Sequence, residues 1–333
     1  MILFFLRRLL ASFLVILAVV GITFLVVRIL PGNPVTAWLG PHPTAEQIEL
    51  ARTQLGLEKP LYQQAWIFFK GIMRGDLGVS LRTRQPVTRE IAQRFAATFE
   101  LTTFAMIMAL VCGIPIGVLA AWYPDHWLAR VEQYISLAGI AIPIFWLGML
   151  LQIMFAGDLR WLPLQGRSVL PPPPHSYTGL LLIDTLLNGE WKKFHDALQH
   201  IVMPAITLAI ASFGIITRNV RVSMAEALRQ SYILNARAMG IPEPRIFFVH
   251  ALKNALIPVI TVAGLVYGYL LGGTFLVEQV FDWPGVGQLA VHSILTNDIP
   301  VITGVALLYA VIYTGINLCL DVLYRWIDPR IRE

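Results

Sequence analysis

The residue types that carry enzyme chemistry occur in this chain only in incomplete patterns. Gly78-Val79-Ser80 begins like a turn that presents a nucleophilic serine, but no second glycine closes it. His195 and His200 are five residues apart, which differs from the i, i+4 spacing of two histidines that share a metal ion. None of the five lysines follows a glycine, so the chain has no glycine-rich phosphate loop for a nucleotide. We therefore expect no catalytic residue, no metal site and no cofactor on this chain.

The segment Arg218–Asn254 is the most distinctive part of the sequence, with six basic residues against two acidic ones. Because no Gly or Pro occurs from Arg218 to Met239, this stretch is expected to form one long helix. Gly240 tolerates a positive φ and suits the end of that helix, and two prolines that follow prevent its simple continuation. A second helix is expected from Arg245 onward. The pattern predicts a helix–turn–helix bracket.

The tip of this bracket has small side chains at Ala236, Ala238 and Gly240. Small residues let the backbone of a partner protein approach closely, and Arg237 and Arg245 can pair with its acidic side chains. A solvated basic loop that only sets membrane orientation explains the same residues equally well. From the residues alone, both interpretations stand.

The elements around the bracket are those of a membrane protein. Hydrophobic residues make up 56% of the 333 residues and charged residues 14%, which excludes an ordinary soluble chain or a disordered one. A helix needs about 20 apolar residues to cross the bilayer. Six stretches meet or approach that length: Leu9–Leu30, Leu101–Trp122, Tyr134–Ala156, Ile201–Thr217, Ala255–Val277 and Val301–Leu320. The first contains Arg28 near its end, and the other five contain no charged residue or histidine. The expected fold is an all-α integral membrane protein with six transmembrane helices.

Charge fixes the expected orientation of these helices. The net charge is +5, and basic residues between apolar runs indicate membrane orientation rather than nucleic-acid binding. The positive-inside rule places Arg218–Asn254, and with it both termini, in the cytoplasm. The chain then divides into an N-terminal transmembrane helix, an extracytoplasmic segment, a core of five transmembrane helices and a cytoplasmic tail: 1–30, 31–98, 99–325 and 326–333. The core includes a second outer segment, 157–200, and the cytoplasmic loop 218–254.

Small residues inside the spans suggest how the helices pack. Gly264, Gly268 and Gly272 recur every four residues on one face of the fifth span, which favours close helix packing over a moving contact that lines a pathway. Four prolines lie inside predicted spans and are expected to cause ordinary kinks: Pro115, Pro143, Pro204 and Pro258. Cys112 and Cys319 are interpreted as small core residues.

Several short motifs resemble one family. Tyr232–Gly240 and His250–Pro258 resemble the EAA loop of ABC importer permeases, in the variant of dipeptide and oligopeptide permeases. Further matches lie at Leu30–Pro34, Leu55–Leu57 with Pro60, Gly75–Ser80, Trp283–Gly287 and Asp328–Arg332, and Thr178–Thr185 is similar to the first membrane subunit of dipeptide permeases. Two positions depart from the usual motifs: Leu234 replaces the glutamate of the EAA motif, and Asn33 replaces an aspartate.

The resemblance implies a type I ABC importer permease in the inner membrane. Its partners would be a second permease subunit, two ATPase subunits that bind ATP and Mg²⁺, and an extracytoplasmic solute-binding protein. The residues that would couple this chain to the ATPases lie at the tip of the bracket: Asn235, Ala236, Arg237, Ala238, Gly240, Ile241, Pro242 and Arg245. The implied substrates are di- and oligopeptides.

Three alternatives remain open at this stage, one of which is a structural or scaffolding membrane subunit that does not transport. An ABC permease could instead carry a nickel chelate, glutathione or an oligosaccharide. An ion-coupled transporter would need a coupling residue in the spans, and none of the predicted spans contains an acidic residue, a lysine or a histidine.

Overall fold

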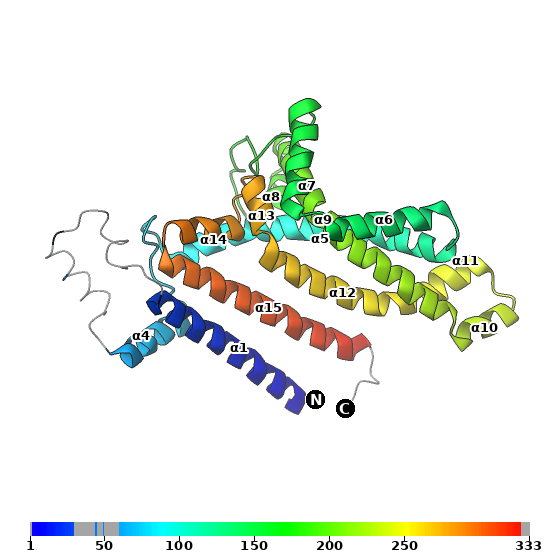
Figure 1. Ribbon diagram of the computed structural model, residues 1–333, viewed down its shortest axis with the longest axis horizontal. Helices are drawn as coiled ribbons and strands as arrows, with labels where there is room; N and C mark the ends of the chain where they lie inside the picture. The colour runs from blue at the N-terminus through cyan, green and yellow to red at the C-terminus, as the bar shows by residue number, and fades with distance from the viewer. Residues whose placement is uncertain (1, 30–43, 45–48, 50–59, 328–333) are drawn as a thin grey trace. The chain divides into compact units, whose positions relative to one another are not determined.

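The computed structural model describes residues 2–29, 44, 49 and 60–327. The motifs Leu30–Pro34, Leu55–Leu57 and Asp328–Arg332, most of the first half of the outer segment 31–98, and the end of the tail lie outside these residues. The described part is helical (Figure 1), with one isolated bridge between Val79 and Pro86. The helices are α1 (Ile2–Ile29), α4 (Leu61–Met73), α5 (Val87–Trp122), α6 (Trp127–Ala141), α7 (Ile144–Leu151), η1 (Gln152–Asp158), α8 (Leu181–Leu187), α9 (Trp191–Leu228), α10 (Ser231–Ala238), α11 (Glu243–Arg245), η2 (Ile246–Ala251), α12 (Leu252–Gly273), α13 (Phe275–Val280), α14 (Val286–Leu295) and α15 (Ile299–Ile327).

Five helical segments of the described chain are long and apolar enough to cross a membrane, and a bent pair of helices makes a sixth. The five lie in α1, in α5, in α9, in α11 through α12, and in α15. The sixth joins Ala129–Gly139 to Ile144–Asp158 across a bend of 107°. The predicted fold class is therefore confirmed, with one span broken near its middle.

Only one of the four prolines breaks its span. Pro115, Pro204 and Pro258 lie inside α5, α9 and α12, whereas Pro143 precedes α7 as its N-cap residue. A proline disfavours helical dihedral angles in the residue before it, so α6 ends at Ala141 and α7 starts in a new direction. The stretch Tyr134–Ala156 was expected to carry an ordinary kink, and that expectation is wrong.

Two helices extend well beyond the predicted spans. α5 begins at Val87, fourteen residues before Leu101, and α9 runs over 38 residues around the predicted stretch Ile201–Thr217. At 1.5 Å per residue, α9 is about 57 Å long, roughly twice the hydrocarbon thickness. Both helices must therefore protrude from the bilayer.

The chain forms two compact units. The first comprises residues up to Thr98 together with Pro284–Leu318. Its core is built from six buried aliphatic side chains: Val87, Ile91, Val286, Leu289, Val301 and Val305. Asp298 fixes the loop before α5, because its carboxylate accepts hydrogen bonds from Ser80 Oγ (2.5 Å) and from the backbone N–H of Leu81 (3.1 Å).

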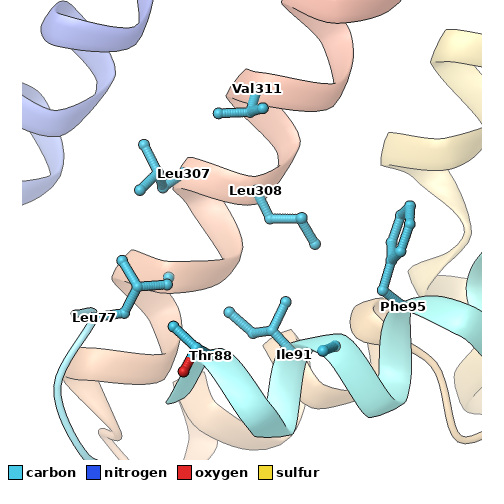
Figure 2. Close-up of a pocket in the computed structure, with 9 residues that line it drawn as sticks. Leu77, Thr88, Ile91, Phe95, Leu307, Leu308 and Val311 are labelled. Atoms are coloured by element: carbon cyan, nitrogen blue, oxygen red, sulfur yellow. The ribbon is translucent and has the colours of Figure 1, made fainter. Parts of the chain in front are cut away.

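An apolar groove of about 390 Å³ opens on this first unit between α5 and α15 (Figure 2). Its walls include Ile91 and Phe95 on α5, and Leu307, Leu308 and Val311 on α15. Gly304 allows the two helices to meet here, since a β-carbon at this position would lie 2.7 Å from Val87 Cγ1. Thr88 supplies the one hydroxyl of the lining, so the groove lacks the polar groups that would orient a charged solute.

The second unit comprises Phe99–Trp283 and the residues from Cys319 onward, and α9 lies at its centre. α6, α8 and α12 all pack against α9 (Figure 1). Glycines make the close contacts possible: a β-carbon at Gly117 of α5 would lie 2.7 Å from Val220 Cβ, and one at Gly214 of α9 would lie 2.9 Å from the Ser136 backbone. Cys112 and Cys319 are exposed on their helices, which corrects their interpretation as core residues.

Candidate functional site

The candidate site is the bracket between α9 and α12. α9 ends at Leu228, and α10 begins at Ser231 after an extended Gln230 with ψ 149°. The predicted continuous helix from Arg218 to Met239 is therefore wrong. The break allows Ile233 of α10 to become fully buried, with 0% exposure. Burial of this face outweighs the local preference for one straight helix.

The turn at Gly240 has the predicted left-handed backbone, with φ at 73°. The N–H of Ile241 donates to the carbonyl of Ala236 (3.1 Å), and the N–H of Gly240 donates to the carbonyl of Arg237 (3.0 Å). These two bonds form a Schellman motif, which satisfies carbonyls at the end of α10. The turn is thus a rigid feature, and Pro242 is the N-cap of the next short helix, α11.

The two faces of the bracket differ in accessibility. Five side chains are buried inside it: Ile233, Ala236, Ile246, Phe247 and Ala251. The small size of Ala236 therefore serves packing within the bracket, and this side chain is not available on its outer surface. Asn235, Ala238, Gly240, Pro242 and Arg245 are exposed, and Ile241 is half-buried. The outer surface at the tip thus retains two of the three small residues that the sequence singled out.

Charged side chains at the tip form an ion pair with each other within this chain. Arg237 was expected to face the acidic groups of a partner protein, but its Nε donates to Glu243 Oε1 (2.7 Å) and its Nη2 to Glu243 Oε2 (3.2 Å). This pair spans the Gly240 turn and is exposed to solvent. Solvent screens such an exposed pair, which therefore contributes little to stability. Arg237 can thus exchange Glu243 for a carboxylate of a partner protein.

Aromatic side chains tie the bracket to the end of α5. The ring of Trp122 stacks on Phe247, with centroids 4.5 Å apart, and also contacts Phe248 at 5.2 Å. Across the bracket, Asn254 Nδ2 donates to the Tyr232 hydroxyl (2.9 Å). Phe247 lies in the π-helix η2, a helix type that often marks functional sites. This contact was not predicted from the sequence, in which a tryptophan at the end of a span and two adjacent phenylalanines were its only signals.

Two buried carboxylates just outside the predicted spans each face an arginine. Glu132 of α6 is 2% exposed, accepts a hydrogen bond from Ser136 Oγ (2.9 Å) and lies 3.4 Å from Arg221 Nε on α9. Glu100 of α5 is 6% exposed and binds Arg167. The apolar stretches themselves contain no acid, but their helices extend far enough to bury these two. Glu132 and Glu100 each have the arrangement of a structural ion pair. A third buried carboxylate, Glu278, directly follows the fifth predicted span and accepts a hydrogen bond from Thr274 Oγ1 (2.8 Å).

The second outer segment is held together by carboxylates that bind its backbone. Asp184 of α8 is buried and accepts hydrogen bonds from the N–H groups of Tyr177, Thr178 and Gly179 and from the hydroxyls of Ser176 and Thr178. Burial raises the pKa of the Asp184 carboxyl, but the hydrogen bonds outweigh it and hold the pKa below its usual value. The stabilisation is thus present at neutral pH and lost in acid, as pH falls through this lowered pKa.

Ser80 and His200, the other residues considered for catalysis or metal binding, make hydrogen bonds within the fold. Ser80 is 1% exposed and hydrogen-bonded to Asp298, so a substrate cannot reach its hydroxyl. His200 Nδ1 lies 2.8 Å from the Asp196 carbonyl oxygen within α9. Among the described residues, no group of His, Cys, Asp or Glu is arranged to hold a metal ion.

The three glycines on one face of α12, at positions 264, 268 and 272, have different surroundings. A β-carbon at Gly264 would collide with the side chain of Leu320, and Gly268 is buried. Gly272 is exposed, and a β-carbon there would meet no described atom within 4 Å. A helix-packing role is therefore our proposal for Gly264 and Gly268, while the surroundings of Gly272 offer it no support.

Two family models together cover nearly the whole chain. Residues 113–333 match the binding-protein-dependent transport system inner membrane component, and residues 1–102 match the N-terminal part of the membrane components of such systems. The chain belongs to this family. The permease is thus a multi-pass inner-membrane component of a binding-protein-dependent transport system.

Relatives of the permease cover it almost end to end. It is 41% identical to a dipeptide transport system permease protein, DppB, of Alkalihalophilus pseudofirmus, over 98% of both chains. It is 43% identical to a probable D,D-dipeptide transport system permease protein, DdpB, of Escherichia coli, over 96% of this chain and 94% of the relative. A glutathione transport system permease protein, GsiC, of Salmonella choleraesuis is 39% identical over 98% of both chains.

Proposed function

We propose that this permease imports di- and oligopeptides that an extracytoplasmic solute-binding protein delivers. The observation that carries the proposal is the full-length similarity to permeases named for dipeptide transport, at 41% and 43% identity. The transmembrane spans that would form a substrate pathway are distributed along the whole chain. The aligned regions of these relatives include all of these spans. Catalysis plays no part on this chain in our proposal.

The proposed assembly contains four further subunits or partners. A second, homologous permease subunit completes the pathway, and two ATPase subunits bind ATP and Mg²⁺ on the cytoplasmic side. The solute-binding protein docks outside, on the outer segments 31–98 and 157–200. The tight hydrogen-bonding of Asp184 and Asp196 to loop backbone supports a preformed docking surface on the second of these segments.

The proposed mechanism is alternating access driven by the ATPases through the bracket. The exposed surface around Asn235, Ala238 and Gly240 would seat in the ATPase. The buried inner face and the Trp122–Phe247 stack make the bracket a rigid lever. Motion at the tip would then reach α5 and α12 without being absorbed by a flexible loop.

Glutathione is the second candidate substrate, since the 39% identity to glutathione permeases spans 98% of the chain. An ion-coupled transporter is a weaker candidate, because Glu100 and Glu132 each face an arginine and the buried Glu278 accepts a hydrogen bond from the Thr274 hydroxyl. Uptake of a labelled dipeptide into proteoliposomes that contain the assembled importer distinguishes the substrates. Unlabelled dipeptides should compete for this uptake, and equimolar glutathione should not. Efficient competition by glutathione alone would transfer the assignment to that tripeptide.

We also propose that both termini and the bracket lie in the cytoplasm, on the basis of the six basic residues in Arg218–Asn254. Single cysteines at Ala238 and at Leu295, which is 74% exposed at the end of α14, would report the sides after Cys112 and Cys319 are replaced. An impermeant thiol reagent added to intact cells should label Leu295→Cys and spare Ala238→Cys. The opposite pattern would reverse the orientation.

A further inference from the structure

The helix α4 exposes an unusual set of side chains. Its 13 residues include no acidic one, and five large side chains on it are more than half exposed: Leu61 (64%), Tyr62 (71%), Trp66 (64%), Ile67 (51%) and Met73 (71%). Lys70 is exposed on the same face, four residues after Trp66. The opposite face is covered, with Gln64 buried. An aromatic and aliphatic face that carries a lysine is typical of helices at a membrane surface.

The position of α4 agrees with this composition. Phe68 of α4 contacts Phe24 of α1, with ring centroids 5.6 Å apart. Phe24 lies in the last turn of the apolar stretch Leu6–Leu25, at the end of the membrane-spanning part of α1. Figure 1 shows α4 beside the C-terminal end of α1, and the two helices are in contact. The middle of α4 is thus held at the depth where hydrocarbon gives way to lipid headgroups.

We propose that α4 is an interfacial helix that binds the surface of the bilayer at the C-terminal end of α1. Tyr62, Trp66, Ile67 and Met73 would enter the boundary between headgroups and acyl chains, where aromatic side chains are favoured. The Lys70 ammonium, on its flexible stem, would reach the lipid phosphates. The helix would thereby anchor the middle of the outer segment 31–98 to the membrane, independently of the substrate that the permease carries.

Spin labels on the full-length permease test this proposal in vesicles of phosphatidylethanolamine and phosphatidylglycerol. Labels would be placed at Trp66→Cys and, as a second variant, Met73→Cys, after Cys112 and Cys319 are replaced. Leu10→Cys, 59% exposed on α1, serves as the lipid reference, and Gln85→Cys in the loop before α5 as the aqueous reference. The ratio of oxygen to nickel-chelate accessibility at positions 66 and 73 should be several-fold higher than at Gln85→Cys and approach that at Leu10→Cys.

Two results would overturn the proposal. Nickel accessibility at positions 66 and 73 equal to that at Gln85→Cys would place this face of α4 in water. Low accessibility to both oxygen and nickel, with an immobilised label, would show that protein covers the face instead of lipid. In addition, Lys70→Glu should move the label at position 66 towards water while Lys70→Arg leaves it unchanged, because only the glutamate repels the lipid phosphates.

Discussion

Gly240→Val is expected to abolish most of the transport activity while leaving the permease in the membrane at near-normal levels. The backbone at Gly240 has φ at 73°, and a left-handed conformation costs an ordinary L-residue about 1–2 kcal/mol, with β-branched residues penalised most. That cost corresponds to a factor of about 5–30 in the equilibrium ratio of the native turn to other conformations. A β-carbon at Gly240 meets no described atom within 4 Å, so the strain lies in the backbone and not in a clash inside the chain. The bulk would also obstruct the surface proposed to seat in the ATPase.

Two further variants separate backbone strain from surface shape. Gly240→Asn should retain much of the activity, since asparagine adopts the left-handed conformation more readily than valine. Ala238→Arg changes only the surface, because Ala238 is an exposed helical residue; transport should fall, with weaker ATPase co-purification. Gln165→Arg in the second outer segment is the matched control and should leave ATPase attachment unchanged. If Gly240→Val and Ala238→Arg both insert normally and transport at wild-type rates, the coupling assignment is wrong.

Arg167→Met is expected to destabilise the second outer segment by about 3–5 kcal/mol, the usual cost of leaving a buried charge without its partner. Arg167 donates to Glu100 Oε2 through Nη2 (2.5 Å) and Nε (3.0 Å), and its Nη2 also donates to the Gly179 carbonyl (3.2 Å). The other oxygen of Glu100 accepts the N–H of Leu182 at 2.7 Å. The pair therefore links α5 to the loop before α8 and to the start of α8 itself. Limited proteolysis between residues 159 and 180, and hydrogen exchange at the Leu182 amide, would measure the loss.

The double variant Glu100→Leu with Arg167→Met tests the physical reason for this loss. Replacing both partners removes the buried charge, so the double variant should be more stable than Arg167→Met alone. Leu182 would still lose its hydrogen-bond acceptor, so recovery should be incomplete. Wild-type protease resistance in Arg167→Met would show that Glu100 does not depend on this arginine.

The spans were predictable from the sequence, whereas the ends of their helices were not. Hydropathy finds apolar stretches, but α5 begins at Val87 in an amphipathic segment where only one face is buried. The break after Leu228 contains no glycine or proline, and it follows from burial of Ile233 against the rest of the bracket. The bend at Pro143 was equally hidden, because Pro115, Pro204 and Pro258 occupy similar sequence contexts and stay inside their helices.

At the candidate site, local features were predictable and long-range contacts were not. The turn at Gly240 followed from one glycine and the prolines after it, and the structure confirms its backbone. The Trp122–Phe247 stack joins residues 125 positions apart, and the Glu100–Arg167 pair joins residues 67 apart. Such partners depend on how the helices pack in space. The burial of Ala236 was not predictable for the same reason. Its small side chain is compatible both with a partner contact and with packing inside the bracket, and the structure shows the second.

The source of energy for transport is the most direct test of the central claim. Proteoliposomes would contain this permease with its proposed partner permease and ATPase subunits, ATP in the lumen, and binding protein with labelled dipeptide in the bath. We predict accumulation of the dipeptide that requires both ATP and the binding protein and persists without any ion gradient. Accumulation driven by a proton or sodium gradient in the absence of ATP would contradict the account.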